Sequence, residues 1–520
     1  MKKKWLLALD GGTGSFRAVV FDFYGNQQAI AQREWQHLPD PRYPGSIDFN
    51  WQYNWPLIVE CIQELLANGI QADEIAAIST TSMREGFVLY DDKGKELLAF
   101  SNVDARSKQE AIDLKEQFPS LEKELYQISG QSFALSAIPR LLWVKNNEPT
   151  IYQKMSTITM LNDWITYKLT GRLSVEPSNA STTGLFSLKD RSWDKKLARR
   201  VGLKETIFPP VIESGCIIGQ VSQNAAKLTG LSAETPVVAG GGDAQLGSIG
   251  VGATKKGQAT LFGGSFWQYE VNSATPTIDS SHRIRINCHA EKEHWQFESI
   301  AWNPGLAMRW FRDAFCQSEK KQASKEKTDV YSLLDQHIAT IPAGCYGMYA
   351  LFSNEMNFLE LKHAAPSFIN FALDAEKFNK YTFYKAIMES AGIVTYGHLL
   401  QAETLTGESP QEIIFAGGAS NNSNWCQIIS DITGKIIKTP IVKEATALGA
   451  AFLAGVGTGV YQDLEETKTY IKWDKCFYPN QENHDSYQEM YAHWQKIYHS
   501  QLDLSNQGLT EYMWIAPGVK

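Results

Sequence analysis

The feature that most constrains this chain is a glycine-rich loop, Gly11-Gly12-Thr13-Gly14-Ser15, between two apolar runs near its start. The flanking runs, 5–9 and 16–23, have the composition of strands, whereas the loop is too rich in glycine for a strand interior. The segment is therefore predicted to be a β-hairpin. A tight turn that needs positive φ would account for the glycines. An anion site would also account for them, because backbone N–H groups without Cβ atoms nearby can surround a phosphate.

Polar residues around this loop favour the anion site. Thr13 and Ser15 would add hydroxyl donors to the backbone N–H groups. Asp10 precedes the loop, where a Mg²⁺ ion bound to a phosphate needs an oxygen ligand, and Arg17 follows it within reach of a terminal phosphate. On these residues alone, both the structural turn and the phosphate loop remain open.

Length and composition narrow the class of protein. A chain of 520 residues is too long for one hydrophobic core, so two or three domains are expected. The net charge of −8 gives no electrostatic reason to expect a nucleic acid or an anionic membrane as a partner. No apolar run has the length of a signal-peptide core or a membrane helix, and the seven cysteines show no CxxC spacing. We therefore expect a soluble cytoplasmic protein.

Two further segments are predicted to have structural roles only. The first holds four metal-type side chains, but their spacing fits no standard zinc pattern and the surrounding sequence alternates as strands do. These side chains are His282, Cys288, His289 and His294. The second, "SEKKQASKEK" (318–327), is a charge run that is typical of a solvated, flexible surface loop.

The pattern of strand, glycine loop and strand recurs half a chain later. "ATLFGGSFWQYEV" (259–271) places Gly263-Gly264-Ser265 between two strand-like runs, as in the opening hairpin. Each hairpin is followed by a buried strand that enters a polar or glycine turn, at 75–86 and at 412–422. A further buried strand, 236–242, enters a glycine turn directly before Asp243. This duplication predicts two α/β domains, residues 1–245 and 246–520, on either side of a cleft.

The motifs select one class of ATP-binding fold. No GxxxxGK[ST] motif and no HRD and DFG pair occurs, which excludes the P-loop and protein-kinase classes as far as motifs can. The phosphate loop and the "GGGD" turn, with "SMREG" (82–86), "NVDARS" (102–107), "HAAPSFIN" (363–370) and "IVKEATALG" (441–449), resemble the FGGY carbohydrate kinase family over essentially the whole chain. The resemblance implies two actin-like, ribonuclease H-like ATPase domains flanking a catalytic cleft, with ATP and Mg²⁺ bound between them.

Carried over residue by residue, the family pattern also implies a set of site residues. It makes Asp243 the catalytic base, and Asp243 and Asp10 the acids that hold Mg²⁺. The implied ATP contacts are Gly12, Thr13, Gly14, Ser15, Arg17, Gly264, Ser265, Gly305, Gly418 and Asn422. The implied substrate contacts are Arg84, Glu85, Asp104, Leu135, Trp267 and Asp243. Many relatives carry threonine where this chain has Gly264, which puts one hydroxyl contact to phosphate in doubt.

Each of these residue types also has a structural interpretation. Asp243 follows three glycines at a strand end, where a carboxylate can project into a cleft or cap a helix. Arg84 and Glu85 could grip a diol or form a structural ion pair. A lone tryptophan such as Trp267 is more often a core residue than a ligand contact. For the glycines, a simple turn explains each one separately, and only their joint order favours nucleotide binding.

The resemblance implies a kinase for a small hydroxylated substrate. Within the family, the motifs are closest to the branch that phosphorylates the terminal hydroxyl of 4,5-dihydroxypentane-2,3-dione. Leu135 replaces a tyrosine of glycerol kinases, which suits a substrate with a less hydroxylated end. The alternatives are another sugar or polyol kinase of the xylulose or glycerol type, and a non-kinase actin-like ATPase. The sequence leaves open whether the chain forms a homodimer and whether a phosphocarrier protein regulates it, as in some relatives.

Overall fold

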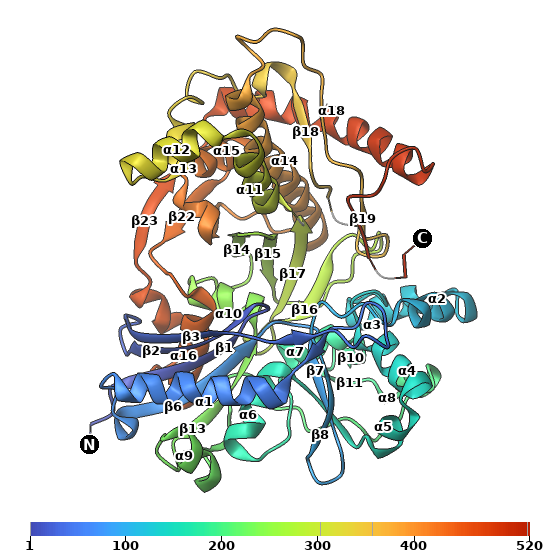
Figure 1. The fold of residues 1–520 in the computed structure, drawn as a ribbon, viewed down its shortest axis with the longest axis vertical. Coiled ribbons are helices and arrows are strands. Elements are labelled where there is room, and N and C mark those ends of the chain that lie inside the picture. The colour runs from blue at the N-terminus through green and yellow to red at the C-terminus, as the bar shows by residue number, and fades with distance from the viewer. Residues whose placement is uncertain (1, 302, 356, 517, 520) are drawn as a thin grey trace.

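The chain forms two α/β lobes, one above the other in Figure 1. The computed structural model describes residues 2–301, 303–355, 357–516 and 518–519. The lower lobe contains the N-terminal sheet and a smaller inserted sheet, and the upper lobe contains a second large sheet (Figure 1). Strands β16 and β17 of the upper sheet extend down to the lower lobe (Figure 1).

The N-terminal lobe is built on a six-stranded sheet of order β12-β13-β6-β1-β2-β3. Strands β1, β2 and β3 form an antiparallel meander, and β6 and β13 extend it in parallel with β1. Burial on both faces explains the apolar runs of β1 and of the first half of β6. The strands are β1 (Trp5–Gly11), β2 (Ser15–Asp22), β3 (Gln27–Glu34), β6 (Ile75–Ser82), β12 (Ile217–Gln220) and β13 (Pro236–Gly242).

The C-terminal lobe repeats this arrangement in a seven-stranded sheet of order β16-β17-β15-β14-β21-β22-β23. Again a hairpin, β14–β15, carries the glycine loop, and its first strand pairs in parallel with a later strand, β21. The predicted duplication is therefore confirmed. The strands are β14 (Ala259–Gly263), β15 (Trp267–Ser273), β16 (Arg285–Cys288), β17 (Trp295–Ala301), β21 (Glu412–Ala416), β22 (Ile436–Pro440) and β23 (Trp473–Phe477).

A five-stranded sheet of order β4-β5-β8-β7-β9 is inserted in the N-terminal lobe. It has its own apolar core, which includes Phe87, Phe100 and Leu141. The strands are β4 (His37–Leu38), β5 (Asp48–Phe49), β7 (Phe87–Tyr90), β8 (Glu96–Phe100) and β9 (Thr157–Met160). The helices around it are α2 (Lys108–Gln117), α3 (Leu121–Ser129), α4 (Ala137–Asn147), α6 (Leu161–Thr170) and α8 (Lys195–Arg200).

Helices cover the faces of the two large sheets. On the N-terminal sheet, α1 (Trp51–Ala67) packs on one face and α16 (Ala445–Gly457) on the other. On the C-terminal sheet, α11 (Pro304–Phe315), α14 (Lys380–Thr406) and α15 (Ser423–Thr433) share the main core with α18 (Gln481–Asn506). The sequence at 484–504 is amphipathic and rich in aromatic residues, which predicts a helix docked on this lobe; α18 confirms it, with its own Trp494 and Tyr498 buried against the core.

The small-residue helix α16 brings the two lobes together. It packs against α10 (Asp243–Gly250), which starts at the glycine turn after β13. A Cβ atom on Gly250 would lie 1.8 Å from the carbonyl oxygen of Ala445, and one on Gly449 would lie 1.9 Å from that of Leu246. Only glycine permits this close approach, so α10, which begins at Asp243, packs tightly on α16.

The structure corrects two expectations about secondary structure. Residues 318–327 were expected to form a flexible loop, but they lie in helix α12 (Gln317–Glu326), rich in the good helix formers Lys, Glu, Gln and Ala. Glu319 anchors this helix through an ion pair with Lys380. Residues 57–67 carry apolar side chains at helical spacing, which predicts a helix there, but the helix begins earlier, at Trp51, because Asn50 caps it, and it contains Pro56. The predicted domain boundary at 245/246 falls within α10.

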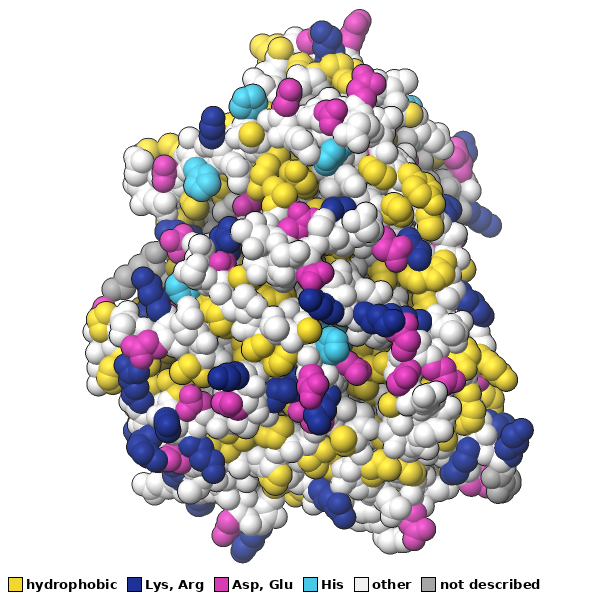
Figure 2. Space-filling view, turned by 180° about the vertical axis from the view of Figure 1, so that it is seen from behind, with side chains coloured by type: hydrophobic (Ala, Val, Ile, Leu, Met, Phe, Trp, Pro, Cys, Tyr) yellow, Lys and Arg dark blue, Asp and Glu magenta, His cyan; other side chains and the backbone are white. Residues whose placement is uncertain are grey.

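The surface has no dominant sign of charge on the face that Figure 2 presents. Basic and acidic side chains are interspersed there, in keeping with the moderate net charge of −8. Within the described ranges, none of the helices combines the length and hydropathy of a membrane-spanning segment.

Candidate active site

The opening loop joins β1 and β2 in a hairpin, and its carbonyl groups face Trp35 and His37. Trp35 donates from Nε1 to the carbonyl of Gly12 and from its backbone N–H to that of Gly14. His37 Nε2 donates to the carbonyl of Thr13 at 2.6 Å. Among the described residues, the N–H groups of Gly12, Thr13 and Gly14 have no hydrogen-bond acceptor. The loop therefore presents a row of free donors, as an anion-binding loop does.

Charged residues adjoin this loop on the cleft side. Asp10 and Arg17 are cross-strand partners, and Arg17 Nη1 lies 3.7 Å from Asp10 Oδ2 and 3.5 Å from Glu444 Oε2, at the start of α16. Burial, with the charges of Asp243 and Glu444, raises the pKa of Asp10 to about 7 against the opposing effect of Arg17. The site thus holds more buried negative charge than Arg17 alone neutralises.

The second glycine loop lines a pocket in the C-terminal lobe with a volume of about 530 Å³. Five of the predicted ATP contacts meet there although they come from three separate segments: Gly264, Ser265, Gly305, Gly418 and Asn422. The pocket also includes Arg309, Arg312, Asp335 and Tyr384, which the sequence did not indicate. Asn422 donates to Asp335 at 3.2 Å, and Arg309 donates to the Ser265 hydroxyl at 3.2 Å.

Two of the glycines predicted to contact ATP, one in each lobe, have no structural reason to be glycine. Gly14 in the first loop and Gly418 in this pocket have ordinary backbone conformations, and a Cβ atom on either would meet no protein atom within 4 Å. Neither a turn nor packing accounts for them, whereas a ligand lying against the bare backbone would. Gly305 differs, because a Cβ there would lie 1.8 Å from the carbonyl oxygen of Gly264.

Asp243 lies between the two loops, at the start of α10. Its Oδ1 accepts hydrogen bonds from its neighbour's backbone N–H (Ala244, 2.8 Å) and from Arg84 Nε (3.2 Å). Within the described part of the chain Oδ2 has no protein partner, and 39% of the side chain remains accessible. Burial of the surrounding site raises the pKa of Asp243, although Arg84 opposes the rise. The arrangement is that of a carboxylate able to accept a proton.

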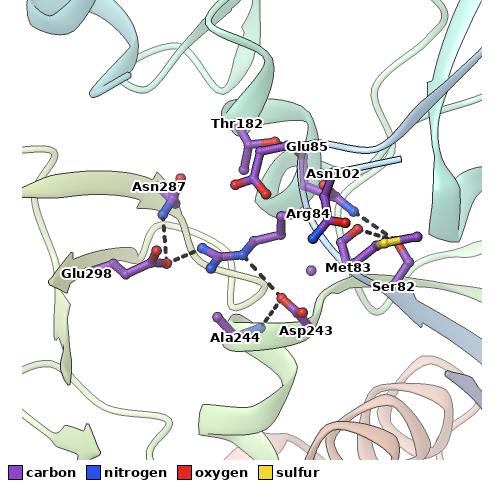
Figure 3. Close-up of polar contacts among 12 residues, drawn as sticks. Ser82, Met83, Arg84, Glu85, Asn102, Thr182, Asp243, Ala244, Asn287 and Glu298 are labelled. Atoms are coloured by element: carbon purple, nitrogen blue, oxygen red, sulfur yellow. Dashed lines mark hydrogen bonds and ion pairs between the residues drawn. The ribbon is translucent and has the colours of Figure 1, made fainter. Parts of the chain in front are cut away.

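An alternating chain of buried charges continues from Asp243 into the C-terminal lobe (Figure 3). Arg84 joins Asp243 to Glu298 on β17, and Arg285 on β16 joins Glu298 to Glu85. Arg285 Nη1 lies 2.6 Å from Glu85 Oε1 and 3.5 Å from Glu298 Oε1. Side-chain exposure is 5% for Arg84, 2% for Arg285 and 0% for Glu298. The predicted pair Arg84 and Glu85 is therefore held by the opposite lobe.

A second buried acid, Glu270 on β15, lies directly opposite Glu298 in the sheet. Burial raises the pKa of Glu270 well above its ordinary value, and the charge of Glu298 adds to the rise. Burial would also raise the pKa of Glu298, but Arg84 and Arg285 lower it below the ordinary value. The surroundings therefore favour the neutral form of Glu270, which accepts from Ser248 at 2.8 Å, and the ionised form of Glu298.

This difference predicts opposite effects for the same substitution at the two acids. Glu270→Gln should leave stability unchanged or raise it at pH 8. Unfolded Glu270 ionises above about pH 4.3, so rising pH favours unfolding of the wild type but not of the variant. Glu298→Gln leaves two buried arginines short of a counter-charge and should destabilise by about 3 kcal/mol or more. Urea denaturation at pH 5 and pH 8 measures both, and a Glu270→Gln variant that loses stability at pH 8 would contradict the assignment.

Two other predicted substrate contacts, Asp104 and Trp267, have protein partners of their own. Asp104 is fully buried at its side chain and pairs with Arg106, and its carboxylate also accepts from the backbone N–H of Ile47. Trp267 lies in the C-terminal core, where it stacks on Trp425 and donates to Thr395. The prediction of a substrate contact gains no support at either residue.

Leu135 has a different setting. It is half-buried and packs against an apolar cluster of Tyr126, Ile300, Phe358, Leu361 and Ala516. Arg285 lies beside the same cluster, with its guanidinium carbon 5.7 Å from the Phe358 ring centroid. The expected apolar wall at Leu135 thus adjoins the chain of buried charges.

Known proteins share these sequence and structural features. Residues 5–250 match the N-terminal domain, and residues 269–458 the C-terminal domain, of the FGGY family of carbohydrate kinases. The autoinducer-2 kinase of Salmonella typhimurium is 47% identical over 518 residues, which is 99% of this chain and 98% of that one. The autoinducer-2 kinase of Escherichia coli K12 is 46% identical over 520 residues, with the same coverage.

Solved structures agree on the fold. The xylulose kinase of Rhodospirillum rubrum superimposes with a TM-score of 0.87 over 96% of this chain and 99% of that one, at 21% identity. Two family domains that together cover most of the chain, and relatives of nearly half identical sequence, leave one assignment. The chain belongs to the FGGY family of carbohydrate kinases, and it is an ATP-dependent phosphotransferase.

Proposed function

We propose that this kinase phosphorylates the terminal hydroxyl of autoinducer-2 in its linear form, 4,5-dihydroxypentane-2,3-dione, in the cytoplasm, where ATP is available. The observation that carries the proposal is Asp243, a carboxylate with a free, accessible Oδ2 between two nucleotide-type loops. The choice of substrate rests on the relatives that are 46–47% identical over 99% of the chain.

In this mechanism, the chain's own residues position the reactants. The free N–H groups of the first loop bind the terminal phosphates of ATP, and the pocket of the C-terminal lobe holds the nucleoside. Asp243 Oδ2 accepts the hydrogen bond of the terminal hydroxyl and orients it for in-line attack on the γ-phosphate. Because the transition state is loose, the proton moves late, and the raised pKa of Asp243 helps it to accept that proton.

Asp10 and Asp243 fit a Mg²⁺ ion that enters with ATP. Burial, together with the charges of Asp243 and Glu444, raises the pKa of Asp10 to about 7, so several acids lie close together here. A divalent cation bound among them would offset their mutual repulsion. No group of three or more metal-type side chains occurs among the described residues, but Mg²⁺ with ATP needs only one or two carboxylates. The ion would supply charge neutralisation to the transferred phosphoryl group.

Arg84 and Glu85 would hold the substrate's diol. The Arg84 guanidinium is fixed between Asp243 and Glu298, so it is preorganised beside the base. Leu135 and the apolar cluster behind it would receive the methyl end. Further hydroxyl groups of a sugar would remain unpaired against this wall, at about 1–3 kcal/mol each.

The proposal predicts a clear substrate preference. The dione should be turned over at least about 10²-fold more efficiently in kcat/KM than xylulose, ribulose or glycerol. Release of ADP by the purified protein, measured with each compound at equal concentration, tests this. Comparable or faster turnover of any pentulose or of glycerol would favour a sugar or polyol kinase of the same family and contradict the autoinducer-2 assignment.

A further inference from the structure

The charged pair contributed by the C-terminal sheet lies on a face that ordinary packing does not explain. Strands β15, β17 and β16 align Glu270, Glu298 and Arg285 in one cross-strand row. The adjacent row on the same face is also polar and consists of Asn272, Gln296 and Asn287. All six residues are buried, with exposures of 2% or less. Burying charges costs free energy and, even when they are paired, adds little stability over apolar packing, so this face is a candidate for substrate recognition.

Arg285 is the residue of this face with an unused donor. Its Nε donates to Gln131 Oε1 at 2.9 Å, and its Nη1 pairs with Glu85 and Glu298. Its Nη2 is buried and has no hydrogen-bond partner among the described residues. A buried guanidinium N–H without an acceptor costs the free energy of its lost hydration, and no protein hydrogen bond offsets that cost. A ligand with an acceptor atom would offset it.

The position of that donor identifies the part of the substrate it would meet. Through Nη1, Arg285 is in direct contact with Glu85, one of the two residues proposed to hold the diol. Its guanidinium also lies beside Phe358, which belongs to the apolar cluster around Leu135. A group that contacts both would carry an oxygen acceptor next to an alkyl end, as a methyl ketone does.

The backbone at Glu85 supports the same conclusion. Glu85 has a φ of 62°, a left-handed conformation that is unfavourable for a non-glycine residue. Such strain persists where the surrounding structure imposes it, and it is frequent at ligand sites. The ion pair with Arg285 is the contact that holds the Glu85 carboxylate in this orientation.

We infer that Arg285 is a specificity-determining residue that donates a hydrogen bond from Nη2 to an oxygen at the ketone end of the substrate. The inference rests on the proposed function, because it places the diol at Arg84 and Glu85. It assigns to the C-terminal lobe, through β16, a direct part in choosing the substrate. Selectivity for a ketone would then come from pairing a buried donor that a simple diol leaves unpaired.

The test compares two substrates that differ only in the ketone oxygens. Wild type, Arg285→Lys and Arg285→Gln are assayed with 4,5-dihydroxypentane-2,3-dione and with 1,2-pentanediol, which keeps the diol. Lysine retains the charge beside Glu85 but not the guanidinium fork. We expect Arg285→Lys to lose about 10- to 100-fold in kcat/KM with the dione and less than about 3-fold with the diol, at unchanged KM for ATP.

A matched control is available on the same part of the sheet. Arg191 is a half-buried arginine; it pairs with Glu213 and donates to the carbonyl groups of His289 and His294, between β16 and β17. Arg191→Lys should therefore show no loss that depends on the substrate. If both Arg285 variants fail to fold, Gln131→Leu removes the acceptor of Nε and should give the same selective loss.

The outcomes separate the inference from the proposed function. Equal losses with the dione and the diol would mean that Arg285 only supports Glu85, and would overturn the inference. A wild-type enzyme that does not phosphorylate the dione would overturn the proposed function instead. In that case the role of Arg285 is tested with D-xylulose and xylitol, two substrates that also differ by a ketone group. A selective loss for xylulose supports the role, and equal losses exclude it.

Discussion

Asp243→Asn is expected to lower turnover by roughly 10²–10⁴-fold while leaving ATP affinity almost unchanged. The amide keeps the size of the side chain and can still accept from Arg84 and from the N–H of Ala244 through its oxygen. It cannot accept the proton of the substrate hydroxyl, and it presents an NH₂ group where Oδ2 is free. The measurement is steady-state ADP release with the preferred substrate, combined with calorimetric titration of ATP.

A buried aspartate outside the site provides the control. Asp163 on α6 is 2% exposed, and burial raises its pKa well above the ordinary value, which favours its uncharged form. Asp163→Asn should therefore retain normal turnover. If Asp243→Asn also retained it, the base would have to be another residue, and the chain of charges from Asp243 to Glu85 would be structural only.

The two glycine loops and the residues near them were predictable from the sequence because they depend on local rules. A run of small residues between apolar runs predicts a hairpin, and the structure has one at each place. The repeat of this pattern also predicted the duplicated lobes. Parallel pairing of β6 and β13 then explains why Arg84 and Asp243, far apart in sequence, follow the ends of neighbouring strands.

Glu298 and Arg285 escaped prediction for a physical reason. In a strand, alternation of polar and apolar residues normally indicates a face exposed to water. The strand β17 reads as "WQFESIA" and alternates in this way, yet its polar face is buried against the other lobe. Only the docking of two lobes turns such a face into part of a site. The alternation in β17 does indicate a polar face, but a single sequence cannot show whether that face contacts water or the polar surface of another domain.

Asp104 and Trp267 illustrate the opposite case, in which the structure adds no support to a predicted contact. Both were inferred from the family pattern, which fixes positions along the chain but not the direction of a side chain. Arg106 pairs with the Asp104 carboxylate, and Trp425 stacks on the Trp267 ring. The carboxylate and the ring face that a substrate would contact therefore already have protein partners. For Trp267, the general tendency of tryptophan to be buried describes the structure better than the family pattern does.

Gly14→Val is expected to weaken ATP binding by about 10²–10⁴-fold without loss of the fold. A Cβ on Gly14 meets no protein atom within 4 Å, and its φ is not in the left-handed region, so the free protein accommodates a larger side chain. The branched side chain would occupy the space over the free N–H groups of Gly12 and Thr13 and displace the phosphate from two or more charge-assisted hydrogen bonds.

Three glycine variants together make this test decisive. Gly14→Ala should reduce affinity less than Gly14→Val, because a methyl group covers less of the loop, and both should keep the wild-type melting temperature. Gly305→Ala should instead destabilise the protein, since its Cβ would lie 1.8 Å from the carbonyl oxygen of Gly264. Calorimetry gives the affinities and thermal denaturation gives the stabilities. A folded Gly14→Val variant with wild-type affinity for ATP would reduce the opening loop to an ordinary turn, because an empty space above a bare backbone would then serve no ligand.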